Sequence, residues 1–130
     1  RNQSFLREIG VDIPIDYASG ARGVSLGAGA FLVCDQGVTP VAFLRELLHF
    51  FAKESCGKCT PCRVGTYRAH EILVRMAVGE GKPGDVDELE RLAELMFDSS
   101  FCGLGQSVPT PIRSALNQFT QAFIDAEKPA

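Results

Sequence analysis

The chain has 130 residues, 45% of them hydrophobic, and a formal net charge of −3. That length fits one modest domain, or a small domain with part of another. The acidic balance argues against a nucleic-acid binder, and no apolar run is long enough to be inserted in a membrane. The N-terminus has neither a secretion signal nor an initiator Met, so we expect a piece of a longer, cytoplasmic protein.

Residues 1–37 are expected to form strands and turns. Val11–Ile15 is predicted to be a short edge strand, because Pro14 cannot donate a hydrogen bond to a neighbouring strand. A glycine-rich stretch follows, and Ala30–Cys34 is predicted to be a buried strand with Cys34 as a core residue. Two strands do not make a stable sheet alone, so this part is expected to be the end of a domain that begins earlier.

Four amphipathic helices are expected in residues 38–130. The first begins where Thr39 precedes Pro40, since a threonine caps a helix well and proline fits its first position. The predicted helices run from Thr39 through Phe51, from Cys62–Arg63 to Val78, from Asp85 through Met96, and from Thr110–Pro111 through Phe123. Apolar residues recur at helical spacing along each, which predicts a small four-helix bundle. The expected inward residues are Val41, Leu44, Leu47, Leu48, Phe51, Ala69, Ile72, Leu73, Met76, Ala77, Val86, Leu89, Leu92, Ala93, Met96, Ile112, Ala115, Leu116, Phe119 and Phe123.

Charged residues are expected to support these helices in two places. Glu71 and Arg75 are four residues apart in the favourable order, which predicts an ion pair on the outside of the second helix. Asp85–Glu88 has the spacing of a capping box at the start of the third.

The chemistry of the chain is concentrated in its cysteines. Cys56, Cys59 and Cys62 form a C-x2-C-x2-C run, and Cys102 follows at a distance. Three thiolates at steps of three residues on an irregular loop can bind three irons of a cubane, and one remote cysteine can bind the last. The pattern predicts a [4Fe–4S] cluster with Cys102 as the fourth ligand.

The residues around the cysteines suit a negatively charged cluster. Gly57 and Gly103 allow the backbone to approach closely and point N–H groups at sulfur, as Gly105 also does. Lys58 and Arg63 add positive charge beside the run. These residues are the expected cofactor contacts.

Other interpretations of the cysteines stay open. A structural zinc site also uses four thiolates, though usually as two C-x2–4-C pairs, and would make the chain a zinc-stabilised helical interaction module. A thioredoxin-like redox pair expects a βαβ setting, and unrelated core cysteines would not show such regular spacing. His49 and His70 are expected to be boundary or surface residues rather than ligands.

The block Glu54–Arg63 resembles the NADH-binding flavoprotein subunit of NADH dehydrogenase (respiratory complex I). It is equally similar to the diaphorase subunits of NAD-linked hydrogenases and formate dehydrogenases. The resemblance continues through Ser100–Cys102 and Pro109–Pro111, and Gly27–Val33 looks like the end of the ubiquitin-like β-grasp (SLBB-like) domain of this family. The resemblance therefore implies an α+β chain, with a β-grasp remnant at 1–37 and a cluster-binding four-helix bundle at 38–130.

The resemblance also implies a function. In this family the cluster held by the four cysteines accepts single electrons from reduced FMN. FMN and NAD bind an upstream domain whose glycine- and arginine-rich loop has no counterpart here, so the chain alone is not expected to oxidise NADH. The implied partners are other subunits of an NADH dehydrogenase, hydrogenase or formate dehydrogenase complex, in the cytoplasm or on the cytoplasmic face of a membrane complex.

Overall fold

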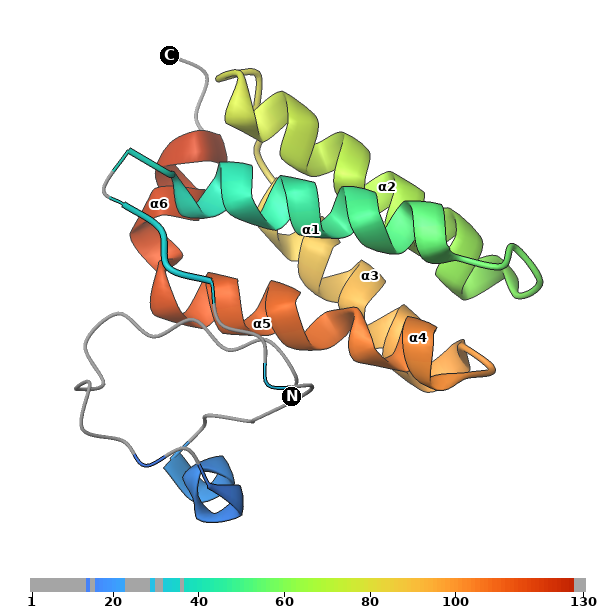
Figure 1. Cartoon of the computed structure of the whole chain (residues 1–130). Coiled ribbons are helices and arrows are strands. Elements are labelled where there is room, and N and C mark those ends of the chain that lie inside the picture. Colours follow the sequence, from blue (N-terminus) through green and yellow to red (C-terminus); the bar gives the residue numbers. More distant parts are fainter. Residues whose placement is uncertain (1–13, 15, 23–28, 30–31, 36, 128–130) are drawn as a thin grey trace.

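A computed structural model describes residues 14, 16–22, 29, 32–35 and 37–127 of the chain (Figure 1). The described residues contain helices and no strand. In chain order the elements are η1 (Tyr17–Arg22), α1 (Pro40–Glu54), α2 (Thr60–Ala77), α3 (Asp85–Ser99), α4 (Gly103–Ser107), α5 (Pro109–Gln118) and α6 (Thr120–Glu127). None of these helices has the length and apolar character needed to cross a membrane.

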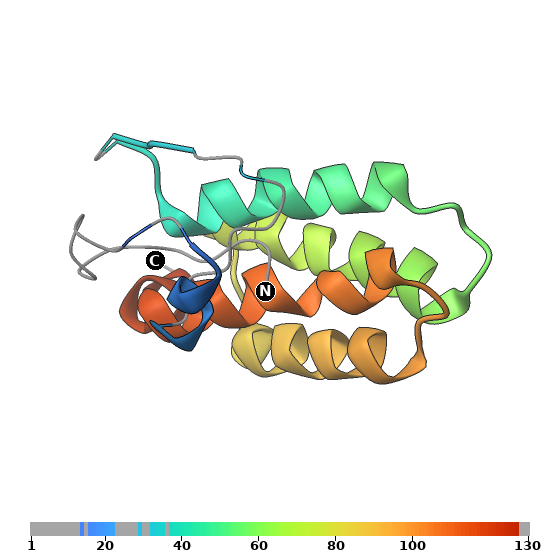
Figure 2. The same ribbon diagram turned by 60° about the horizontal axis from the view of Figure 1, so that its bottom comes forward.

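The longer helices α1, α2, α3 and α5 form an antiparallel bundle, which confirms the predicted helical bundle (Figures 1 and 2). α1 packs mainly on α2, α2 also on α3, and α3 also on α5. Their apolar faces meet in one core, so burial of these faces holds the helices together. The core residues are Val41, Leu44, Leu48, Phe51, Ala69, Ile72, Leu73, Met76, Leu89, Ala93, Met96, Val108, Ile112, Ala115 and Phe123.

The start of α1 is as predicted. The Thr39 side chain accepts a hydrogen bond from the backbone N–H of Ala42 at 3.2 Å, and Pro40 occupies the first position of the helix. Leu44 and Leu48 are fully buried one turn apart. Removing a leucine side chain from such a site costs about 2–5 kcal/mol, so this face anchors the helix.

Two predicted polar contacts are wrong: the capping box at the start of α3, and the ion pair between Glu71 and Arg75 on α2. Gly84, with a φ of 93°, is the residue before the helix, and Asp85 is its first residue rather than its cap. The Asp85 carboxylate accepts hydrogen bonds from the Lys82 N–H and from Arg75 Nε, each at 2.9 Å. Glu71 instead pairs with Arg68 at 3.2 Å. Because Asp85 is only 3% exposed, its carboxylate needs hydrogen-bond partners. Arg75 therefore pairs with Asp85 and not with Glu71, whose side chain is more exposed.

Burial alone would raise the pKa of Asp85, but the hydrogen bonds from the Arg75 guanidinium and the Lys82 N–H lower it below its ordinary value. The bidentate, charge-assisted ion pair between Arg75 and Asp85 therefore joins the C-terminal turn of α2 to the first turn of α3.

The last predicted helix is divided into two helices, α5 and α6. Thr110 lies inside α5, which begins at Pro109, and the helical direction changes at Phe119, whose φ and ψ are −128° and 35°. The change brings Phe123 of α6 into the core, where it is fully buried. The end of α6 also lies against the α2–α3 turn, because a Cβ on Gly81 would overlap the Ala126 carbonyl oxygen.

The few described residues among 1–37 show no strand of the predicted β-grasp remnant. Val11–Ile15 lies outside the described residues except for Pro14. Leu32–Cys34 is not a strand, and Leu32, Val33 and Cys34 are exposed, so the prediction that Cys34 is a core residue is wrong. An apolar run becomes a buried strand only beside another strand, and the described residues offer it none. The predicted domain boundary at 37/38 stays a prediction.

Candidate metal centre

The two cysteine-bearing segments lie at the same end of the bundle. The α1–α2 loop, with Cys56 and Cys59, and the α3–α4 connection, with Cys102, emerge side by side at the right of Figures 1 and 2. In an antiparallel bundle the first and third connections lie at the same end. Contact is direct, since a Cβ on Gly105 of α4 would stand 3.0 Å from the Cβ of Cys62 on α2.

The cysteines of this end differ in exposure. Cys59 and Cys62 are buried, with exposed fractions of 6% and 4%, while Cys56 and Cys102 are exposed. Cys59 immediately precedes α2, and Cys102 immediately precedes α4. Each of the two therefore stands at a helix start, one from each half of the chain.

Electrostatic coupling joins the four thiols. The backbone N–H of Phe101 is the main influence that lowers the pKa of the Cys59 thiol, against the opposing effect of burial. Burial is the main cause that raises the pKa of the Cys62 thiol, and the Ser55 hydroxyl opposes it. Negative charges on the other three cysteines raise that pKa further. Cys62 thus lies near enough to the other three cysteines to be affected by their charge as thiolates, and positive iron ions would offset that charge.

The loop between α1 and α2 is held in shape by its own residues. Gly57 has a φ of 75°, a conformation that suits glycine and few other residues. The Arg63 guanidinium donates from Nη1 to the Gly57 carbonyl oxygen at 3.1 Å. The Ser55 hydroxyl lies 3.4 Å from Cys62 Sγ and accepts from the Gly57 N–H at 3.4 Å. Lys58 is exposed.

The predicted cofactor contacts fall at this end of the bundle, but not all have a visible task. Gly57 and Arg63 shape the cysteine loop, as described above. A Cβ on Gly103 would meet no atom within 4 Å, so no described residue requires glycine there. Its predicted approach to a cluster, like the charge role of Lys58, stays a prediction.

Sequence reasoning missed the polar residues that fasten the second segment. The Gln106 side chain donates to the Ser100 carbonyl oxygen at 3.0 Å, which closes the turn that carries Cys102. Ser100 is 5% exposed and its hydroxyl has no hydrogen-bond partner in the described part of the chain. The only signal in the sequence was their nearness to Cys102.

Among the described residues, no three Cys, His, Asp or Glu side chains are grouped so as to hold a single metal ion. A zinc ion needs its sulfur ligands at about 2.3 Å from one point. In a [4Fe–4S] core, by contrast, each cysteine binds a different iron and the sulfurs stand farther apart. The arrangement gives the zinc alternative no support.

The histidines are not part of this centre. His49 and His70 contact each other across α1 and α2, with ring centroids 5.0 Å apart. Burial is the main cause that lowers the pKa of His70, followed by the charge of His49. His49 is exposed and His70 is half-buried, in line with the prediction that both are boundary or surface residues.

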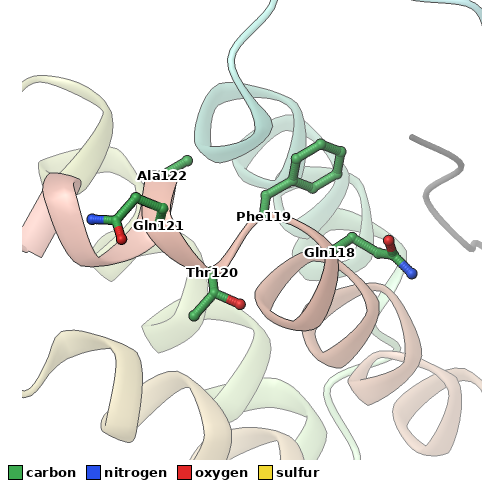
Figure 3. Close-up of a pocket in the computed structure, with 5 residues that line it drawn as sticks. All are labelled: Gln118, Phe119, Thr120, Gln121 and Ala122. Atoms are coloured by element: carbon green, nitrogen blue, oxygen red, sulfur yellow. The ribbon is translucent and has the colours of Figure 1, made fainter. Parts of the chain in front are cut away.

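A shallow pocket of about 240 Å³ lies at the α5–α6 junction (Figure 3). It is lined by Gln118, Phe119, Thr120, Gln121 and Ala122. These residues carry no charge and no thiol, and α6 lies at the end of the bundle away from the cysteine loops (Figure 1). The pocket therefore adds nothing to the metal centre.

The fold is thus a helical bundle with cysteines gathered at one end. Residues 42–126 match the model of the NADH-ubiquinone oxidoreductase-F iron-sulfur binding region, and the chain belongs to this family. It is 41% identical over 122 residues to the NADP-reducing hydrogenase subunit HndC of Solidesulfovibrio fructosivorans, a match over 91% of this chain and 25% of that protein. It is 37% identical over 121 residues to an NADH-quinone oxidoreductase subunit of Escherichia coli K12, covering 92% of this chain and 27% of that protein.

Solved structures agree with the sequence matches. The chain resembles a subunit in the crystal structure of an NAD⁺-reducing [NiFe]-hydrogenase in its H₂-reduced state, with a TM-score of 0.70 and 37% identity. That match covers 75% of this chain and 17% of the hydrogenase chain. The chain spans about a quarter of the length of the curated relatives described above.

Proposed function

We propose that Cys56, Cys59, Cys62 and Cys102 bind one [4Fe–4S] cluster, and that the chain relays single electrons within a larger NAD-linked oxidoreductase subunit. The cluster supplies one-electron redox chemistry when bound. The observation that carries the proposal is the junction of the two cysteine-bearing segments at one end of the bundle. Gly105 packs against Cys62 there, and the Phe101 N–H faces Cys59.

The chain's own residues have three tasks in this proposal. The Arg63–Gly57 hydrogen bond and the Ser55 hydroxyl fix the loop of the first cysteines. The Gln106 side chain fixes the turn that presents Cys102. Burial of Cys59 and Cys62 keeps water from one side of the centre, which influences a cluster's potential.

The partners extend the same proposal. Electrons would arrive from reduced FMN in the parent subunit, which also binds NAD, and the chain alone would bind neither. The parent assembly is an NADH dehydrogenase or hydrogenase complex, or a related formate dehydrogenase, in the cytoplasm or at the cytoplasmic face of a membrane complex. Relatives named as NADH-quinone oxidoreductase and hydrogenase subunits support the first two of these assemblies.

Anaerobic reconstitution with iron and sulfide tests the ligand set. We expect about four irons and four sulfides per chain. Cys102→Ala should yield a three-iron or labile cluster and a lower melting temperature for the loaded protein. Cys34→Ala, at an exposed cysteine outside the centre, is the matched control and should leave both unchanged. One zinc per chain without sulfide, or an unaltered four-iron spectrum in Cys102→Ala, would refute the ligand set.

A further inference from the structure

The hydroxyl group of Ser100 is a buried polar group that the ligand set leaves unexplained. The residue is 5% exposed, and its Oγ has no hydrogen-bond partner among the residues that the structure describes. Burying an unpaired hydroxyl is unfavourable, and native proteins rarely leave one without a partner. A group outside the protein chain is therefore the natural acceptor or donor for this oxygen.

The backbone polar groups of Ser100 both have partners within the chain. Its N–H donates to the Met96 carbonyl oxygen at 3.2 Å, which ends α3. Its carbonyl oxygen accepts from Gln106 Nε2 at 3.0 Å, which ties it to α4. The hydroxyl is thus the one polar group of this residue that the described part of the fold leaves unpaired.

The location of the hydroxyl is the cysteine end of the bundle. A Cβ on Gly105 would overlap Ser100 Oγ and stand 3.0 Å from the Cβ of Cys62, so the two side chains border the same small space. The next residue, Phe101, directs its N–H to the Cys59 thiol. Ser100, which directly follows α3, therefore lies beside Cys62, one of the proposed ligands.

Ser55 provides a useful contrast. Its hydroxyl lies 3.4 Å from Cys62 Sγ and accepts from the Gly57 N–H, so it already has partners within the chain. Ser100 approaches Cys62 from the other segment and has none among the described residues. The difference indicates that the Ser100 hydroxyl is set up for a partner that arrives with the cofactor.

We propose that the Ser100 hydroxyl donates a hydrogen bond to a sulfur atom of the bound iron–sulfur cluster and raises its reduction potential. The inference rests on the proposed function and deepens it. A donor interacts more strongly with the more negative, reduced state, so it favours reduction. The electron goes to the cluster and the proton stays on Ser100 Oγ, so no proton transfer accompanies the step. Ser100 would contact the cluster only through this hydrogen bond and is not proposed as an iron ligand.

The test compares Ser100→Ala with Ser107→Ala. Ser107 is the matched control, because its hydroxyl on α4 donates to the Leu104 carbonyl oxygen at 2.8 Å and is satisfied within the chain. Without cluster, Ser100→Ala should melt at the same temperature as the parent chain or higher, since it loses an unpaired buried hydroxyl. With cluster, the sign should reverse and Ser100→Ala should melt lower.

The redox readout is an EPR-monitored titration of the reconstituted proteins. Ser100→Ala should shift the equilibrium toward the oxidised cluster by about threefold to tenfold, where tenfold corresponds to 59 mV for one electron. Pulsed EPR of the reduced cluster in H₂O and D₂O should show one exchangeable proton fewer in Ser100→Ala. Ser107→Ala should keep both the potential and that proton.

An unchanged potential together with an unchanged set of exchangeable protons in Ser100→Ala would overturn the inference. So would a cluster-free Ser100→Ala chain that melts well below the parent, because the hydroxyl would then have a partner within the protein. This comparison of melting temperatures uses the cluster-free proteins, so it tests the inference even if Ser100→Ala takes up little iron and sulfide. Failure of the proposed function is seen separately, as failure of the parent chain to take up iron and sulfide.

Discussion

Gly105→Ala is expected to destabilise the cluster-free chain by about 1–2 kcal/mol. Alanine gains up to about 1 kcal/mol over glycine inside a helix, and less in a helix as short as α4. Its Cβ, however, would stand 2.5 Å from the Cβ of Ser100 and 3.0 Å from that of Cys62. Hydrogen bonds fix the Ser100 backbone on both sides, so a rotamer change cannot relieve the contact. Overpacking of this kind costs about 1–3 kcal/mol, which exceeds the gain in helix propensity.

Gly103→Ala is the matched control for this change. It lies in the same helix, and its Cβ would meet no atom within 4 Å, so we expect a change within about 0.5 kcal/mol. The assay is urea denaturation of the cluster-free proteins followed by circular dichroism, with midpoints compared at equal slope. Equal stability of the two variants would contradict the close packing of α4 on Cys62. It would also contradict the junction of the two cysteine-bearing segments.

Three further results are expected. In the loaded protein, Gly103→Ala should lose iron faster than the parent if this glycine approaches the cluster, and iron retention over time measures it. Arg75→Ala should lower the free energy of unfolding by about 1–3 kcal/mol at neutral pH, because it leaves Asp85 buried without its partner. The pKa of Asp85 is lowered, so this loss should be present above its ordinary value of 3.8 and shrink as the pH falls through the lowered value, in melts from pH 7 to 3. The pKa of His70 is also lowered, so the folded state binds fewer protons than the unfolded state below pH 6.5, and the free energy of unfolding should fall as the pH drops. His70→Gln should reduce this dependence of stability on pH.

The bundle could be predicted from sequence because its signal is local. Leu44 and Leu48 recur at helical spacing, and Thr39 caps α1 through a contact three residues away. The start of α3 was not predictable in this way, because the group that satisfies Asp85 is Arg75, at the end of another helix. The same holds for the turn at Phe119, which depends on the space that Phe123 fills in the core.

The candidate centre also has features that local sequence predicts and features that depend on tertiary contacts. The spacing of Cys56, Cys59 and Cys62 indicates a cluster without any structure, because ligands on one loop obey a short-range rule. The tasks of Ser100 and Gln106 follow only from the fold, since their contacts join α3 to α4 and α4 to α2. Cys34 was misplaced because burial of a strand depends on neighbours that its own sequence does not specify.

The unequal exposure of the cysteines leaves the proposed centre accessible from one side. With Cys59 and Cys62 buried against the bundle and Cys56 and Cys102 exposed, the protein insulates one side of the centre and leaves the other near the surface. Electron tunnelling weakens steeply with distance, so a partner that contacts the exposed cysteines has a short path to the proposed centre. Phe101, which is 85% exposed beside Cys102, marks that side. In the described part of the chain, the proposed centre is thus open to a redox partner at the end of the bundle that carries Cys56 and Cys102.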